Sequence, residues 1–179
     1  MLYGPLASAA TPGITGQGGS ASFDLSAEAA LISQPDGQAV YSWGYGCRSG
    51  STSASFAPAA IPGPASGCPS MQIPGPTLIV QQGATVTITL TNNLPPAAGN
   101  TSMLFPGFTL APFAAGNGVP GLLTQEAKVG QSVTYTFVAT TPGTHSYYSG
   151  TQGDLQVEMG LYGAIVVLPT LSAVGLPDG

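Results

Sequence analysis

Charged side chains are scarce in this 179-residue chain. Two basic residues stand against seven acidic ones, so charged residues make up 5% of the sequence and the formal net charge is −5. The chain therefore lacks the basic surface that nucleic-acid binding requires, and that class of partner is excluded. The same shortage removes the polybasic segment that would hold a protein at an anionic membrane surface.

Long hydrophobic runs are also missing. No apolar stretch approaches the roughly 20 residues that a membrane-spanning helix needs, so no membrane span is expected. Residues 1–5 lack the basic and apolar regions of a signal peptide, and we interpret the chain as a mature or trimmed form. So few charges suit a secreted, periplasmic or cell-surface protein, or a packed assembly, better than a cytosolic enzyme.

Cysteine and histidine are nearly absent. Cys47 and Cys68 enclose a Gly/Pro/Ser-rich loop, which predicts a disulfide; two free buried thiols are the alternative. Two cysteines without histidine neighbours are too few for a structural zinc site. His145 is the only histidine. A surface or capping role is favoured over a metal-ligand role, because one imidazole is not a coordination sphere.

Glycine and proline are abundant, at 26 and 17 residues, while 43% of the chain is hydrophobic. This combination favours a loop-rich all-β fold over disorder. The clearest strand signal runs from Ala84 to Thr91, where Val86, Ile88 and Leu90 alternate with threonines. Period-2 alternation of β-branched residues is typical of a half-buried strand.

Other segments repeat this signal more weakly. We predict further strands within residues 23–32, 39–45, 77–94, 132–139, 144–149 and 161–168. The first of these also has helix propensity, but Phe23, Leu25 and Leu31 fit period 2 better. Seven or eight short strands between Gly/Pro turns predict an all-β Greek-key sandwich or barrel.

The domain boundaries follow from composition. Residues 1–20 are predicted to be a flexible N-terminal segment, and residues 169–179 a linker-like tail. Between them, residues 21–168 form the domain, which includes a long loop at residues 46–76 tied by the two cysteines.

Three blocks of sequence carry a family resemblance. Residues 74–95 contain Pro-Gly-Pro-Thr-Leu and Thr-Asn-Asn-Leu-Pro, and residues 118–137 contain Gly-Val-Pro-Gly and Gly-x-Ser-x-Thr-Tyr-x-Phe. Residues 142–167 contain Pro-Gly-Thr and Gly-Leu-Tyr-Gly-Ala-Ile-Val-Val. In this order the blocks resemble the first cupredoxin domain of multicopper oxidases, over most of residues 72–168. The resemblance implies a cupredoxin-type sandwich and a copper-dependent oxidoreductase parent.

The copper ligands of that family do not accompany the resemblance. Its first domain uses two His-x-His pairs, since alternate residues of a strand share one face. The first pair falls on Leu104 and Pro106, and the second on Tyr148 and Gly150. Leucine, proline and glycine side chains cannot ligate a metal. The resemblance therefore implies no catalytic residue and no copper cofactor in this chain, although the parent family uses copper.

Two functions remain open. The chain is either the N-terminal domain of a multicopper-oxidase-like protein, or a copper-free structural or self-assembling extracellular module. Its partners would be further cupredoxin domains or identical protomers. We expect no redox activity from this chain alone, whereas the parent family is enzymatic.

A few polar and soft side chains complete the candidates. Asn100 begins an Asn-Thr-Ser glycosylation sequon. Asp154 and Glu158 lie four residues apart in a predicted loop, as a solvated face or, less favoured, an acid/base pair. We expect the remaining candidates to be packing residues: Met103, Tyr147, Tyr148, Met159 and Tyr162.

Overall fold

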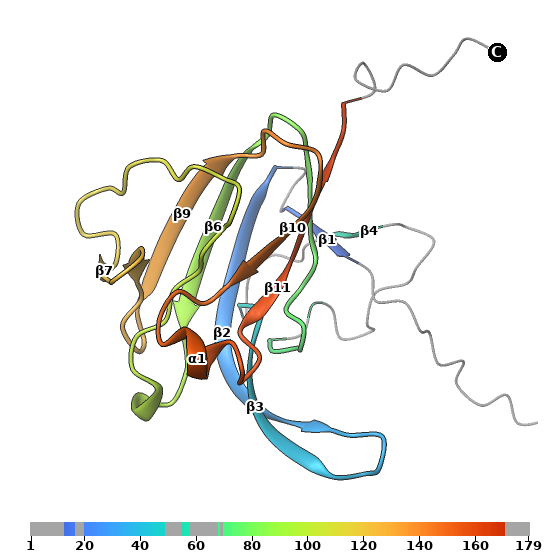
Figure 1. Cartoon of the computed structure of the whole chain (residues 1–179), viewed down its shortest axis with the longest axis vertical. Coiled ribbons are helices and arrows are strands. Elements are labelled where there is room, and N and C mark those ends of the chain that lie inside the picture. Colours follow the sequence, from blue (N-terminus) through green and yellow to red (C-terminus); the bar gives the residue numbers. More distant parts are fainter. Residues whose placement is uncertain (1–12, 17–19, 49–54, 58–67, 69, 171–179) are drawn as a thin grey trace, which may run out of the picture.

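The computed structural model describes residues 13–16, 20–48, 55–57, 68 and 70–170. Two β-sheets lie face to face (Figure 1): one has the strand order β10-β11-β5-β1-β4 and the other β3-β2-β6-β9. A small third sheet joins β7 and β8. Within the described residues, no helix is long and apolar enough to cross a membrane. The elements are β1 (Gly13–Thr15), β2 (Ser22–Ser33), β3 (Ala39–Cys47), β4 (Ser55–Ala57), β5 (Leu78–Gln81), β6 (Thr85–Asn92), the 3-10 helix η2 (Pro96–Ala98), β7 (Val119–Pro120), β8 (Gln125–Glu126), β9 (Ser132–Val138), β10 (Gly143–Tyr148), α1 (Gly153–Gln156) and β11 (Tyr162–Leu168).

Strand β6 confirms the period-2 prediction. Val86, Ile88 and Leu90 are fully buried, while the threonines between them face the other side of the sheet. β6 pairs with β9 in antiparallel and with β2 in parallel orientation. On the outer face, the hydroxyls of Thr89 and Thr134 lie 3.1 Å apart in a cross-strand hydrogen bond. The alternation thus builds both the core and a polar outer surface.

Strand β11 is an interior strand of its sheet, with neighbours on both sides, as its apolar run predicts. It pairs with β10 in antiparallel and with β5 in parallel orientation. Ile165 and Val167 are buried and face the opposite sheet together with Leu78 and Val80 of β5. A strand with neighbours on both sides favours such a continuous apolar sequence.

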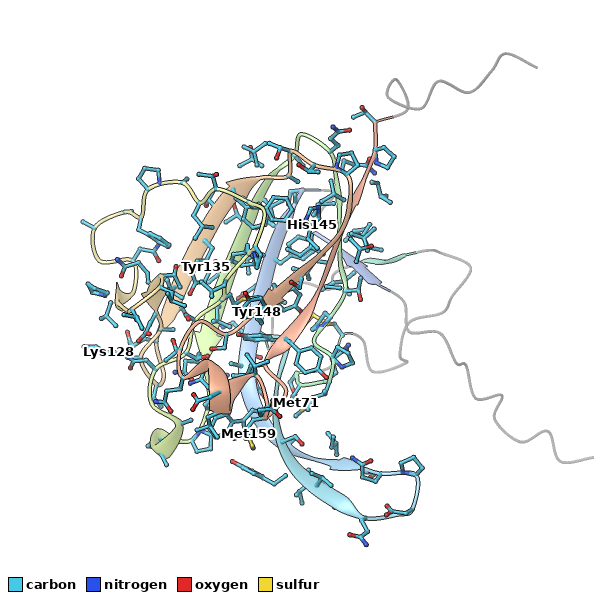
Figure 2. All side chains as sticks on the ribbon, in the orientation of Figure 1. Met71, Lys128, Tyr135, His145, Tyr148 and Met159 are labelled. Carbon is cyan, nitrogen blue, oxygen red and sulfur yellow. A yellow bond between two sulfur atoms is a disulfide. The ribbon has the colours of Figure 1, made fainter. Side chains whose placement is uncertain are left out.

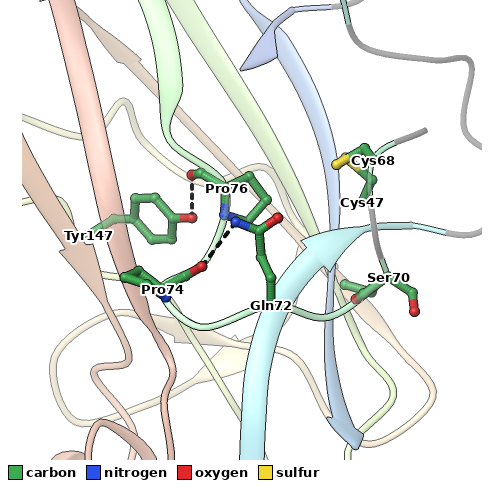
Figure 3. The surroundings of a disulfide bond; sticks show 8 residues. Cys47, Cys68, Ser70, Gln72, Pro74, Pro76 and Tyr147 are labelled. Atoms are coloured by element: carbon green, nitrogen blue, oxygen red, sulfur yellow. Dashed lines mark hydrogen bonds between the residues drawn. A yellow bond between two sulfur atoms is a disulfide. The ribbon is translucent and has the colours of Figure 1, made fainter. Parts of the chain in front are cut away.

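Three buried tyrosines connect the core to surrounding loops. The hydroxyl of Tyr45 donates to the Ser102 carbonyl, that of Tyr135 to Gln125 and that of Tyr147 to Pro76 (Figure 3), each at 2.7 Å. Their rings fill the core while each hydroxyl has a backbone partner. Burial raises the pKa of all three phenols well above the usual value near 10.

The N-terminal segment is more structured than predicted. Within residues 1–20, Gly13–Thr15 form β1, which pairs with β4 and β5. The cause is Ile14, which is 3% exposed and lies in register with Leu78 of β5. Likewise β4 lies inside the predicted loop at residues 46–76. Three residues of the segment that was predicted to be flexible therefore form a strand. Residues 1–12, 17–19 and 171–179, the last holding most of the predicted tail, lie outside the described residues.

The hairpin of β2 and β3 extends beyond the rest of its sheet as an arm (Figure 1). β6 pairs with β2 only over Ser22–Ala27. Farther along, Leu31 and Tyr41 face each other across the arm and are 67% and 50% exposed. Leu31 keeps the predicted period-2 position relative to Phe23 and Leu25. It is not part of the core, because it lies beyond Ser22–Ala27, the part of β2 that pairs with β6.

The predicted disulfide is confirmed. Cys47, at the end of β3, is bonded to Cys68 with a sequence separation of 21 residues (Figure 3). The bond holds the loop at residues 46–76 to the end of a core strand. Both cysteines are half-buried and pack against the core.

We predict that the disulfide contributes about 3 kcal/mol to the free energy of unfolding, because it closes a loop of this length in the unfolded chain. Urea unfolding of a Cys47→Ser/Cys68→Ser variant would measure the loss. The reduced wild-type chain is the matched control and should show a similar loss. Equal stability of the oxidised and reduced chains would contradict the prediction.

The buried tyrosines predict a stability limit at alkaline pH. Above about pH 10 the phenols of the unfolded chain ionise, whereas Tyr45, Tyr135 and Tyr147 stay protonated in the folded chain. Folding stability is thus fully present below pH 10 and falls as the pH rises through and beyond it. Phenolate absorbance should show these three of the seven tyrosines titrating only as the protein unfolds. Reversible titration of all seven in the folded chain would refute this.

Candidate functional site

Three of the four positions that correspond to copper ligands in the resembled family lie together. Leu104 and Tyr148 form an antiparallel β-bridge, in which the Leu104 N–H donates to the Tyr148 carbonyl at 2.7 Å. Gly150 lies two residues beyond Tyr148, and a Cβ atom there would be only 2.8 Å from the Leu104 Cγ. Pro106 lies two residues after Leu104 and is exposed. The backbone thus brings together positions that are distant in sequence.

The side chains at these positions give the site an apolar character. Leu104 fills the space above Gly150, which has no side chain to oppose it. Next to it, Tyr148 is half-buried. Among the described residues, no group of three or more His, Cys, Asp or Glu side chains could hold a metal ion. The residues present therefore do not fit a copper ion, which requires nitrogen or sulfur donors.

His145 lies elsewhere on the same strand (Figure 2). It pairs with Ile165 across β10 and β11, and its ring centroid lies 4.5 Å from that of Phe108. Its Nε2 is 2.9 Å from the Thr141 carbonyl oxygen. Strand alternation directs His145 and Tyr148 to opposite faces. These contacts give His145 a packing role.

Behind the apolar site lies a buried polar network centred on Gln156. Its Oε1 accepts hydrogen bonds from the hydroxyls of Thr101 and Ser149, at 2.9 and 2.7 Å. Its Nε2 donates to the Asn100 carbonyl at 2.8 Å. Helix α1 places this side chain in the interior, where it is 0% exposed. One amide thus joins the segments that carry Leu104 and Gly150.

Glu126 extends the network toward the surface. Its carboxylate accepts hydrogen bonds from the Thr151 hydroxyl at 2.8 Å and from the Asn100 Nδ2 at 3.0 Å. The amide of the predicted glycosylation sequon is therefore engaged inside the domain. Sequence reasoning missed this network, although polar clusters at residues 100–102 and 149–151 between apolar positions were its visible signal.

The other candidates are distributed over the molecule. Asp154 is exposed in the first turn of α1, and Glu158 is exposed after that helix, so the prediction of a plain loop is wrong for this segment. Met103 is fully buried and Met159 packs against the core. Tyr148 lies opposite Tyr162 across β10 and β11.

A pocket of about 650 Å³ opens beside the apolar site. Its lining includes Leu104, Leu122, Leu123, Tyr148 and Val157. Pockets in this volume range commonly bind apolar groups. The arrangement is therefore suited to hydrophobic contact.

We predict that Gln156→Met lowers the free energy of unfolding by about 2–4 kcal/mol, because it leaves the Thr101 hydroxyl and the Asn100 carbonyl without their partner. Chemical denaturation would measure this loss. The matched control is Gln131→Met, which replaces an exposed glutamine and should change stability by less than about 0.5 kcal/mol. Equal effects of the two variants would show that the network does not stabilise the fold.

Comparison with known proteins gives a consistent family match. A family model described as multicopper oxidase matches residues 69–172. Laccase 1 of Metarhizium acridum (strain CQMa 102) is 35% identical over 105 residues, covering 59% of this chain and 16% of that protein. Multicopper oxidase MCE of Talaromyces pinophilus is 36% identical over 98 residues, covering 55% of this chain and 15% of that protein. The chain thus spans about a sixth of the length of these relatives.

Solved structures show the same fold. A multicopper oxidase crystal structure aligns with 83% of this chain and 42% of its own, at 27% identity and a TM-score of 0.56. A multi-copper oxidase from Pseudomonas Thermotolerans aligns with 88% of this chain and 30% of its own, at 20% identity and a TM-score of 0.60. At 20% identity, the second likeness concerns the fold alone.

Proposed function

Because the chain belongs to the multicopper oxidase family, as the match over more than half of its length shows, we propose that it serves as the N-terminal cupredoxin domain of a multicopper-oxidase-like protein. In this proposal the domain holds no copper of its own. Its contribution is structural: it presents a folded face to neighbouring cupredoxin domains.

The observation that carries the proposal is the occupancy of the ligand-equivalent positions. Leu104 and Tyr148 are paired across a β-bridge and Leu104 packs over Gly150, so the backbone has the arrangement that paired ligands would need. The side chains offer one phenol and no imidazole. A phenol is a poor substitute for the histidine nitrogens that copper sites favour.

The activity of the whole protein would then reside elsewhere. The chain spans only about a sixth of its curated relatives, which leaves most of such a protein to hold copper and substrate. We infer that the partners are further cupredoxin domains or identical protomers. A secreted, periplasmic or cell-surface location is supported by the Cys47–Cys68 disulfide. A structural module unrelated to oxidases is disfavoured by the family match.

Copper analysis tests the proposal directly. After saturation with copper and desalting, the purified chain should retain no metal, and its visible and EPR spectra should be silent. One copper tightly held per chain would overturn the proposal. In that case His145→Ala would show whether the only histidine is a ligand.

A designed variant tests the positions themselves. We predict that Leu104→His/Tyr148→His creates a Cu(II) site, because the two imidazoles would face each other across the bridge. Copper at 100 times the dissociation constant should then stabilise the variant by about 2.7 kcal/mol, measured as a rise in Tm. Leu104→His alone is the control and should respond much less. Equal responses would mean that positions 104 and 148 do not form a ligand pair.

A further inference from the structure

Two leucines occupy the tip of the β7–β8 hairpin. The turn is closed by a hydrogen bond from the Gly121 N–H to the Thr124 carbonyl at 3.0 Å. Between these residues, Leu122 is 92% and Leu123 is 63% exposed. Turn tips ordinarily carry Gly, Asn, Asp, Pro or Ser. Two adjacent exposed leucines at such a position indicate a contact surface.

This tip is held in a fixed position. Val119 and Pro120 pair with Glu126 and Gln125. Glu126 is in turn fixed by its hydrogen bonds to Thr151 and Asn100. A Cβ atom at Gly121 would overlap the Glu126 side chain, so the turn packs closely on its anchor. The leucines are therefore presented outward by a supported hairpin.

The 650 Å³ pocket adjoins the same tip. Leu122 and Leu123 form part of its lining, together with Leu104, Tyr148 and Val157. Of all the residues that line it, only Asp154 carries a formal charge. A protruding apolar knob and an apolar hollow thus lie side by side on one face. We call this face the Leu122 face.

We propose that the Leu122 face binds a second copy of this chain, with the leucine tip of each copy in the pocket of the other. A two-fold axis brings the same patch of both copies together, so a face with both knob and hollow is complementary to itself. With one carboxylate per copy at the pocket, like-charge repulsion across the contact is small.

The shape of the face supports this choice of occupant. A second copy carries both the exposed leucine tip and the pocket, so each feature meets its counterpart. The inference deepens the proposed function by naming its partner, and it rests on that function only in taking the face to be free of metal.

The β2–β3 arm provides a matched comparison. Leu31 is also well exposed, at 67%, and lies opposite Tyr41 on a two-stranded ribbon. It is not among the residues lining the pocket. A leucine substitution on the arm therefore removes similar exposed apolar surface without touching the Leu122 face.

Sedimentation velocity from about 1 μM to 1 mM tests the proposal. The wild-type chain should shift from monomer to dimer over this range. Leu122→Ser/Leu123→Ser should weaken the dimer at least about 100-fold, since burying a leucine side chain stabilises by one to two powers of ten. Val157→Lys, which puts a charge into the pocket, should have the same effect. Leu31→Ser should dimerise like the wild type, and circular dichroism would verify that each variant is folded.

Three results would overturn the inference: a wild-type chain that is monomeric throughout, a dimer that is lost with Leu31→Ser, or a dimer that survives either Leu122→Ser/Leu123→Ser or Val157→Lys. Copper content of the same samples separates the two proposals. A copper-free monomer refutes the second-copy interface and leaves the proposed function standing. Bound copper refutes the proposed function instead.

Discussion

Burial of one face of β6 is the constraint on which the rest of the structure depends. Val86, Ile88 and Leu90 lie at the centre of the core, and the strand that carries them pairs with β2 on one side and β9 on the other. This fixes the register of its sheet, because a slip by one residue would exchange the apolar side chains with threonines. The second sheet covers this face, with β11 and β5 among its interior strands. The loops that carry Leu104 and Gly150 follow strands β6 and β10 of these two sheets.

Strand positions and fold class could be read from the sequence because they are encoded locally. The alternation in β6 and β9 indicates which face of each strand is buried, and the apolar run of β11 indicates an interior strand. Both signals are local and need no knowledge of distant residues. The disulfide could also be predicted from the sequence, since two cysteines allow only one pairing. The limits of this reading appear in β2, where Phe23 and Leu31 obey the same period yet differ in burial. Periodicity predicts which face of the sheet a side chain lies on. Whether that face is buried depends on how far the neighbouring strand β6 extends along β2.

The candidate site was predictable only in part, since its content is tertiary. The vacated positions 104 and 148 could be aligned with a family motif, and the backbone places them opposite each other. The contacts of Gln156 with Thr101 and Ser149 join residues from separate loops, and a short polar residue gives no local sign of a partner that is 55 positions away. Strand β1 was missed for a related reason: three residues in a Gly/Ala/Thr-rich stretch become a strand only because Leu78 offers Ile14 a place to pack.

The contact between Leu104 and Gly150 also restricts how this domain can change. Any side chain at position 150 meets the leucine, so a histidine there requires Leu104 to shift or to be replaced by a smaller or polar residue. A single histidine at position 104 would have no partner at 150 and would leave the space above the glycine poorly filled. Each single step toward a metal site that uses both position 104 and position 150 therefore carries a packing penalty. In the metal-free form that we propose, the packing of Leu104 on Gly150 therefore opposes the gain of a metal site at these two positions.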